Sequence, residues 1–89
     1  MKDGVSEMQI FMNQQEQAKI NLQPVKSSQI SKIGYHAESK TLVVKFKNGA
    51  MYSYSDVPEK IYNELLAAES LGKYFHTRVR NIFKYQKLT

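Results

Sequence analysis

The sequence of 89 residues has no cysteine, no tryptophan and only two histidines. Without cysteine it has no disulfide, no thiolate metal ligand and no cysteine nucleophile, as is common in the reducing cytoplasm. His36 and His76 lie far apart, and neither has a second ligand one helical turn away. Because metal sites need several such ligands, the sequence predicts no metal and no cofactor.

Long hydrophobic runs are also missing. No apolar stretch approaches the roughly 18 residues that a membrane-spanning helix needs. The N-terminus lacks the apolar core and the cleavage site of a secretion signal. We therefore expect a cytoplasmic protein without membrane contact.

The motifs of common enzymes are absent as well. There is no G-x-S-x-G nucleophile turn and no phosphate-binding glycine loop, and Asn48-Gly49 has the chemistry of a turn. Asp56, Glu59, Glu64 and Glu69 fall in or beside one predicted helix, where capping and solubility explain them. We predict that the protein is not an enzyme.

Charge is what the sequence does have, and it is unevenly spread. The net charge is +5, yet residues 1–23 carry two lysines against three acids. Residues 70–89 carry five lysines and arginines and no acid. Such a basic end is typical of a surface for phosphates or for an acidic protein, although a solvated helix face explains it equally well.

The first 23 residues are expected to form an extension of a domain that covers residues 24–89. Ser6 to Gln9 has the S-x-x-Q form of a capping box, and apolar residues follow at helical spacing. This pattern predicts a helix over about residues 6–18. Asn21 to Ser28, which contains Pro24, is expected to be a linker.

Three segments are rich in β-branched and aromatic residues and predict strands at about 29–36, 40–47 and 50–55. Asn48-Gly49 predicts a hairpin between the second and the third strand. A two-residue loop would expose Tyr52 and Tyr54 beside Lys45 and Lys47, like a platform on which bases stack.

A three-residue loop with a left-handed Gly49 is the alternative. It pairs Val44 with Tyr52 and Leu42 with Tyr54, so that the large side chains share one face. Since burial selects the register of a strand, we prefer this loop, which makes the tyrosines core residues with hydroxyls at the rim.

Two helices are expected to follow. Asp56 and Pro58 predict the start of a helix over about residues 57–69, with Asp56 as the side-chain cap. Ser70 can cap a second helix over about 71–82. The buried stripe of this second helix is expected to comprise Leu71, Phe75, Val79 and Ile82. The fold class is therefore α+β, with a three-stranded antiparallel sheet covered by two helices.

Residues 25–86 resemble the KTSC domain family, which is named after the C-terminal extension of some lysyl-tRNA synthetases. The resemblance rests on several elements in the expected order: Ile33-Gly34-Tyr35, Asn48-Gly49, Tyr52-x-Tyr54, Val57-Pro58, Gly72-x-Tyr74-Phe75 and Val79-Arg80. It implies a small bacterial or phage protein of unestablished function, and the link to a synthetase implies RNA binding only by association.

The first functional hypothesis is a non-catalytic module that binds nucleic acid, with RNA as the expected partner. Cations interleaved with aromatic residues can hold phosphates and stack bases. The candidate residues are Lys45, Lys47, Lys73, Tyr74, His76, Arg78, Arg80 and Lys84. Arg80 has an alternative role in the fold, tied to Tyr52, Tyr54 or a backbone carbonyl.

The second hypothesis is a protein-interaction or self-association module, encoded by a phage and acting on a host protein. Its candidate surface is the apolar face of Met8, Phe11 and Met12. It predicts that a chain without residues 1–23 folds as a monomer that has lost its partner. A third option is a pocket for a nucleotide or a peptide between the sheet and the helices.

Overall fold

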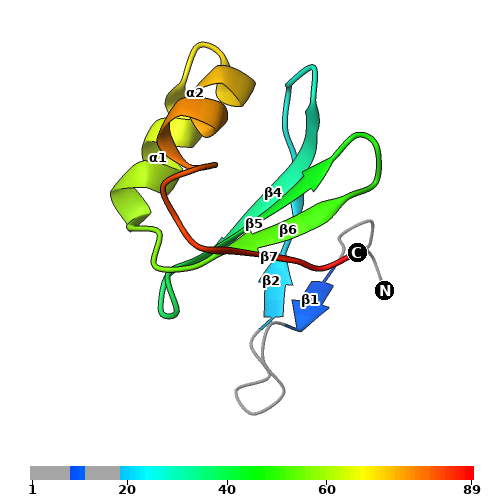
Figure 1. The fold of residues 1–89 in the computed structure, drawn as a ribbon, viewed down its shortest axis with the longest axis vertical. Coiled ribbons are helices and arrows are strands. Elements are labelled where there is room, and N and C mark those ends of the chain that lie inside the picture. The colour runs from blue at the N-terminus through cyan, green and yellow to red at the C-terminus, as the bar shows by residue number, and fades with distance from the viewer. Residues whose placement is uncertain (1–8, 12–18) are drawn as a thin grey trace.

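A computed structural model describes residues 9–11 and 19–89 of the chain. A sheet of five antiparallel strands, in the order β3-β4-β5-β6-β7, forms its centre, and two further strands, β1 and β2, pair with each other (Figure 1). In chain order the elements are β1 (Gln9–Phe11), β2 (Lys19–Asn21), β3 (Gln23–Pro24), β4 (Ile30–His36), β5 (Thr41–Phe46), β6 (Met51–Tyr54), α1 (Glu59–Ala67), α2 (Leu71–Arg78) and β7 (Tyr85–Lys87).

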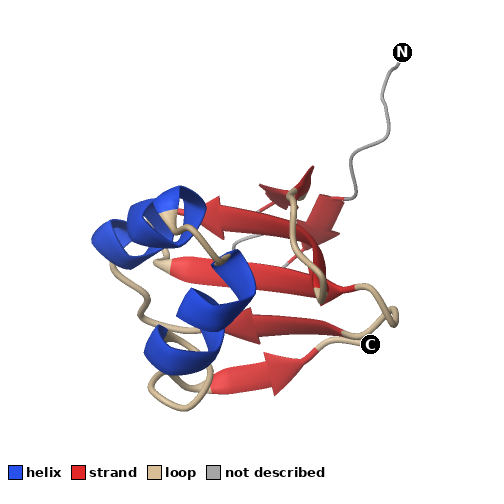
Figure 2. Ribbon diagram, turned by 90° about the horizontal axis from the view of Figure 1, so that it is seen from above, coloured by secondary structure: helices blue, strands red, loops and turns tan. Residues whose placement is uncertain are grey.

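Both helices pack on one face of the five-stranded sheet (Figure 2). The core between these layers contains Leu42 and Val44 of β5, Tyr54 of β6, Leu65 of α1 and Phe75 of α2. The α+β class expected from the sequence is confirmed. The two helices together bury the apolar face of the sheet because each presents a stripe of apolar residues at helical spacing.

The hairpin between β5 and β6 has the three-residue loop that burial favoured. Val44 pairs with Tyr52 and Leu42 with Tyr54. Gly49 has a φ of 95°, a conformation that residues with a side chain rarely adopt. The Phe46 amide donates to the carbonyl oxygen of Ala50 at 2.8 Å, which closes the loop. Both tyrosines therefore face the helices.

The opposite face of the sheet is also covered. Val43 and Met51 point to this back face, where they form a second cluster with Ile20 and Leu22. All four side chains are at least 93% buried, since their exposure lies between 0% and 7%. The segment 19–22, which the sequence analysis placed in an extension, thus supplies half of a small second core.

Gly34 of β4 lies where this segment approaches the sheet most closely. A Cβ atom at Gly34 would lie 2.5 Å from the carbonyl oxygen of Asn21 and 2.7 Å from the Ile20 Cγ2. A backbone atom cannot give way without moving β2. The glycine is therefore needed for space and not for an unusual φ.

Gly34→Ala is expected to lower the free energy of unfolding by about 2 kcal/mol, the usual cost of overpacking. Gly72→Ala in α2 is the matched control, because its Cβ would meet only Ser27 Oγ at 3.5 Å. A glycine inside a helix costs roughly 0.5–1 kcal/mol relative to alanine, so this variant is expected to gain stability. Denaturant titration of both variants measures the difference, and the same sign in both would contradict the close approach at Gly34.

Three expectations for the sheet and the N-terminal segment were wrong. The sheet has five strands and not three, because β3 and β7 add an edge strand on each side. Within the expected helix over 6–18, residues Gln9–Phe11 form a strand paired with β2, and positions 6–8 and 12–18 lie outside the described residues. The expected linker contains β3 and the buried Leu22.

The helices are shorter than expected. Asp56 does not cap α1, since its φ of 59° belongs to a left-handed turn and Pro58 takes the cap position without a side-chain hydrogen bond. Ser70 caps α2 as predicted, accepting from the Lys73 amide at 3.3 Å. Helix α2 ends at Arg78, and Ile82, expected in the buried stripe, is 60% exposed.

Candidate functional site

A pocket of about 320 Å³, here called the aromatic pocket, opens between the sheet and the end of α2. Its sheet side consists of Phe46 from β5, Tyr52 and Tyr54 from β6 and Tyr85 from β7. Side chains alternate along β6, so Tyr52 and Tyr54 share the face that the helices cover. Tyr85 pairs with Tyr54 across the two strands and so lies beside it. The ring centroids of Tyr54 and Tyr85 are 6.1 Å apart.

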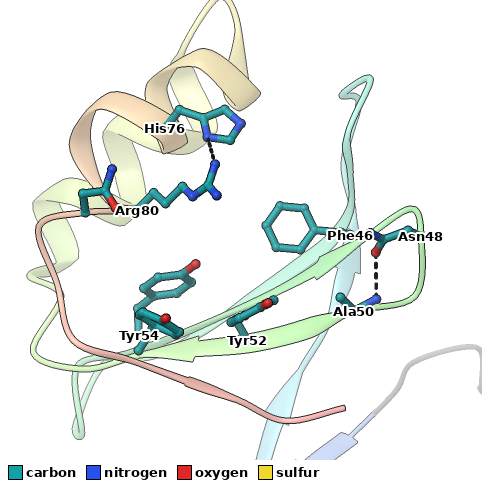
Figure 3. A pocket seen from close by; sticks show the side chains of 9 residues that line it. Phe46, Asn48, Ala50, Tyr52, Tyr54, His76 and Arg80 are labelled. Carbon is teal, nitrogen blue, oxygen red and sulfur yellow. Dashed lines mark hydrogen bonds between the residues drawn. The ribbon is translucent and has the colours of Figure 1, made fainter.

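His76, Arg80 and Asn81 form the opposite side of the aromatic pocket, and Asn48 and Ala50 of the hairpin loop complete it. Figure 3 shows Phe46 and the two tyrosines of β6 extending from the sheet toward the side on which His76 and Arg80 lie. Arg80 Nη1 lies 3.3 Å from His76 Nδ1. No carboxylate lines the pocket, and Arg80 gives it a positive charge.

The tyrosines of the pocket differ in exposure. Tyr54 is 3% exposed, whereas Tyr85 is 62% exposed and presents its ring to solvent. Burial raises the pKa of Tyr54 to about 12, and the nearby charge of Arg80 acts against this rise. The Tyr54 hydroxyl therefore keeps its proton throughout the neutral range and can donate a hydrogen bond there.

Two of the predicted nucleic-acid-binding residues, His76 and Arg80, are brought together in the aromatic pocket. Lys47 is exposed in the hairpin loop next to Asn48, and Lys84 is exposed just before β7. Arg80 contacts His76, and its charge acts against the rise of the Tyr54 pKa. The role in the fold that was considered for Arg80 stays a prediction.

The other predicted residues lie apart from the pocket. Tyr74 donates to Glu64 Oε1 and so ties α2 to α1, while Arg78 lies over the Tyr74 ring at 5.8 Å. Lys73 is exposed on α2. Lys45 alternates with the pocket-facing residues of β5 and pairs with Met51, so it belongs to the opposite face of the sheet.

Most residues that line the pocket, and the neighbouring Lys87, were not among the predicted site residues. The lining residues missed are Phe46, Asn48, Ala50, Tyr52, Tyr54, Asn81 and Tyr85. Lys87 pairs with Tyr52 across β6 and β7, which places it on the same face as the tyrosines. If residues 85–87 had been predicted as a strand, the alternation along Tyr85-Gln86-Lys87 would have placed Lys87 on the face of Tyr85. Asn48 Oδ1 accepts from the Ala50 amide at 2.9 Å, so the Asn48 side chain also holds the loop.

The residues of the second hypothesis are not placed. Met8 and Met12 lie outside the described residues, and of Phe11 only the backbone in β1 is described. Their role in binding a partner stays a prediction.

Residues 9–11 and 19–89 contain no group of three or more His, Cys, Asp or Glu side chains that could hold a metal ion. The helices of this part, α1 and α2, have nine and eight residues, and neither is long enough to cross a membrane.

Comparison with known proteins agrees with the fold and with the motifs. The family model described as KTSC domain matches residues 26–85. The crystal structure of a KTSC domain protein from Yersinia pestis superposes with a TM-score of 0.74 at 32% identity, covering 79% of this chain and 99% of that one. A protein from Tsukamurella paurometabola is 40% identical over 63 residues, which are 71% of this chain and 94% of the relative.

A lysine–tRNA ligase from Trichormus variabilis is 37% identical over 60 residues, which are 67% of this chain but only 11% of the ligase. The similarity therefore concerns a small module of that enzyme. The family match begins at residue 26, so the strands β1, β2 and β3 and the buried Leu22 lie before it.

Proposed function

Because the chain belongs to the KTSC domain family, a module that also occurs in lysine–tRNA ligases, we propose that it is a non-catalytic RNA-binding module. The observation that carries the proposal is the aromatic pocket, where tyrosine rings lie beside Arg80 and no acid is present. Proteins that bind single strands combine these two features, because bases stack on aromatic rings while cations hold the phosphates.

The charges around the pocket support the same function. Lys47, Lys84 and Lys87 are all exposed, and each lies in the hairpin loop, before β7 or in β7. The acids of the described residues lie elsewhere, in α1, at its two flanks and in the turn after β4. A strand of RNA that enters the pocket would therefore meet cations along its backbone on this edge of the sheet.

Binding is expected to be sensitive to salt and to Arg80. If three to four phosphates are neutralised, the logarithm of the association constant falls with the logarithm of salt with a slope of about −2 to −3 for a single strand. Arg80→Glu is expected to weaken binding about tenfold or more, because it places an acid where a phosphate would bind. Fluorescence anisotropy with a labelled 12-nucleotide single-stranded RNA measures both effects.

Lys60→Glu is the matched control, since Lys60 is exposed on α1 and the change in net charge is the same. An equal loss in the two variants would mean that net charge and not the pocket drives binding. No binding of RNA or of single-stranded DNA at low salt would contradict the proposed function.

A further inference from the structure

The hydroxyl group of Tyr54, a residue that lines the aromatic pocket, has no structural task within the described part of the fold. Tyr54 is 3% exposed, and among residues 9–11 and 19–89 its hydroxyl has no hydrogen-bond partner. Its oxygen is not one of the enclosed polar atoms of the fold, so it is reached through the aromatic pocket that Tyr54 lines. A hydroxyl that is open to a pocket can donate a hydrogen bond to a group that enters it.

Arg80 lines the same pocket as this hydroxyl, and its charge acts on the Tyr54 pKa. A guanidinium can only donate, so the contact of Arg80 Nη1 with His76 Nδ1 means that this ring nitrogen accepts. The proton of the neutral His76 ring is then on Nε2, which donates to Gln29 Oε1 at 2.8 Å. Gln29 thereby orients His76, and His76 orients Arg80. The guanidinium keeps further N–H groups for an anion.

The ring of Tyr85 supplies a flat aromatic surface on which another ring can stack. It is 62% exposed, and its centroid lies 5.6 Å from that of Tyr52. The pocket between these groups has about 320 Å³, at the lower end of the roughly 300–1,000 Å³ of ligand sites. It has room for one small molecule that carries both an anionic group and a flat ring.

We propose that the aromatic pocket binds a single nucleotide, with its phosphate between the Arg80 guanidinium and the Tyr54 hydroxyl and its base against the exposed ring of Tyr85. This inference rests on the proposed function, because the nucleotide is one unit of the bound RNA. It adds which part of the RNA is recognised and assigns Tyr54, which the fold alone would leave as a core residue, to the binding site.

The test uses the full chain and three probes, which are adenosine monophosphate, adenosine and inorganic phosphate. Titrations followed by nuclear magnetic resonance of the backbone amides give the affinity and the residues affected. The monophosphate is expected to bind about tenfold more tightly than either adenosine or phosphate, because only it engages both Arg80 and Tyr85. The shifted amides are expected in β6, in β7 and around Arg80.

Tyr54→Phe is the decisive variant. It is expected to weaken binding of the monophosphate and of the 12-nucleotide RNA by about tenfold, the usual effect of a hydrogen bond to a charged group. Its Tm is not expected to fall, because the hydroxyl makes no hydrogen bond within the described part of the fold. Tyr62→Phe is the matched control, since Tyr62 is a half-buried tyrosine of α1 outside the pocket.

The outcomes separate the two proposals. RNA binding that persists in Tyr54→Phe, without binding of the monophosphate, overturns the nucleotide pocket and leaves the RNA-binding function intact. Binding of the monophosphate that Tyr54→Phe weakens, without any RNA binding, supports the pocket and contradicts the RNA-binding function. Equal binding of phosphate and of adenosine monophosphate overturns the part assigned to the base.

Discussion

A chain that begins at Gln23 is expected to be largely unfolded at 25 °C. It lacks Ile20 and Leu22, which are each 1% exposed, and it uncovers Val43 and Met51 on the back of the sheet. Each such side chain contributes about 1.5–3 kcal/mol when it is buried. The loss is on the order of 5–10 kcal/mol, which is comparable to the whole stability of a domain of this size. The hypothesis of a protein-interaction module predicts instead that a chain without residues 1–23 folds as a monomer that has lost its partner, and the buried Ile20 and Leu22 argue against this folded monomer.

Thermal unfolding followed by far-ultraviolet circular dichroism checks this result. The matched control is a chain that begins at Lys19, which keeps β2 and Leu22 and is expected to unfold cooperatively. The comparison isolates residues 19–22 from the segment before them. A cooperative transition at the same Tm in both chains would show that stability does not depend on the packing of residues 19–22 against the back face of the sheet.

Phe75→Ala is expected to lower the free energy of unfolding by about 3–5 kcal/mol, as is usual for a fully buried phenylalanine. Phe75 is 0% exposed and lies at the centre of the core between the helices and the sheet. Its ring meets Phe46 and Tyr54 edge to face, with centroids 5.6 and 5.4 Å away. The variant therefore loses apolar burial and aromatic contacts and leaves a cavity beneath the aromatic pocket.

Ile82→Ala is the control for this variant, and denaturant titration measures both. Helical spacing assigned Phe75 and Ile82 to the same buried stripe, yet Ile82 is 60% exposed beyond the end of α2. Its substitution is expected to change the free energy of unfolding by no more than about 0.5 kcal/mol. A comparable loss in the two variants would contradict the end of α2 at Arg78.

The hairpin between β5 and β6 shows what local rules can predict. Asn48-Gly49 marked the turn, and alternation of apolar residues selected the loop in which Val44 pairs with Tyr52. A slip by one residue would have turned every side chain of β6 to the wrong face, so the burial pattern carried enough information to decide. The same pattern placed Lys45 on the face away from the tyrosines, and it could have excluded Lys45 from the site.

The strands β3 and β7 show what local rules miss. They have two and three residues, and all five of these residues are exposed. Such segments show no alternation of buried apolar and exposed polar residues. They become strands only because β4 and β6 offer free edges. The strand β1 has the same origin, since Gln9–Phe11 are paired by β2 although the sequence around them favours a helix.

Of the residues in the candidate site, the sequence pointed to only two, His76 and Arg80. The basic and aromatic character of residues 70–89 follows from composition, and it pointed to His76 and Arg80. The pocket itself joins Phe46 and Tyr54 of the hairpin to Tyr85, which lies more than 30 positions further along the chain. Register predicted that Tyr54 is buried. The proposal that its hydroxyl binds a ligand depends instead on the nearby Arg80 and on the lack of a hydrogen-bond partner among residues 9–11 and 19–89.

The sequence by itself determined the α+β class, the three central strands, the two helices, the register of the hairpin and the family. These features depend on periodicity and turn chemistry, which act between near neighbours along the chain. Only the tertiary structure decided the edge strands, the cover of the back face, the exposure of Ile82 and the assembly of the aromatic pocket. These features depend on which surfaces pack together when the chain folds. The segments that meet are distant in the sequence, and the local sequence of each is compatible with more than one environment.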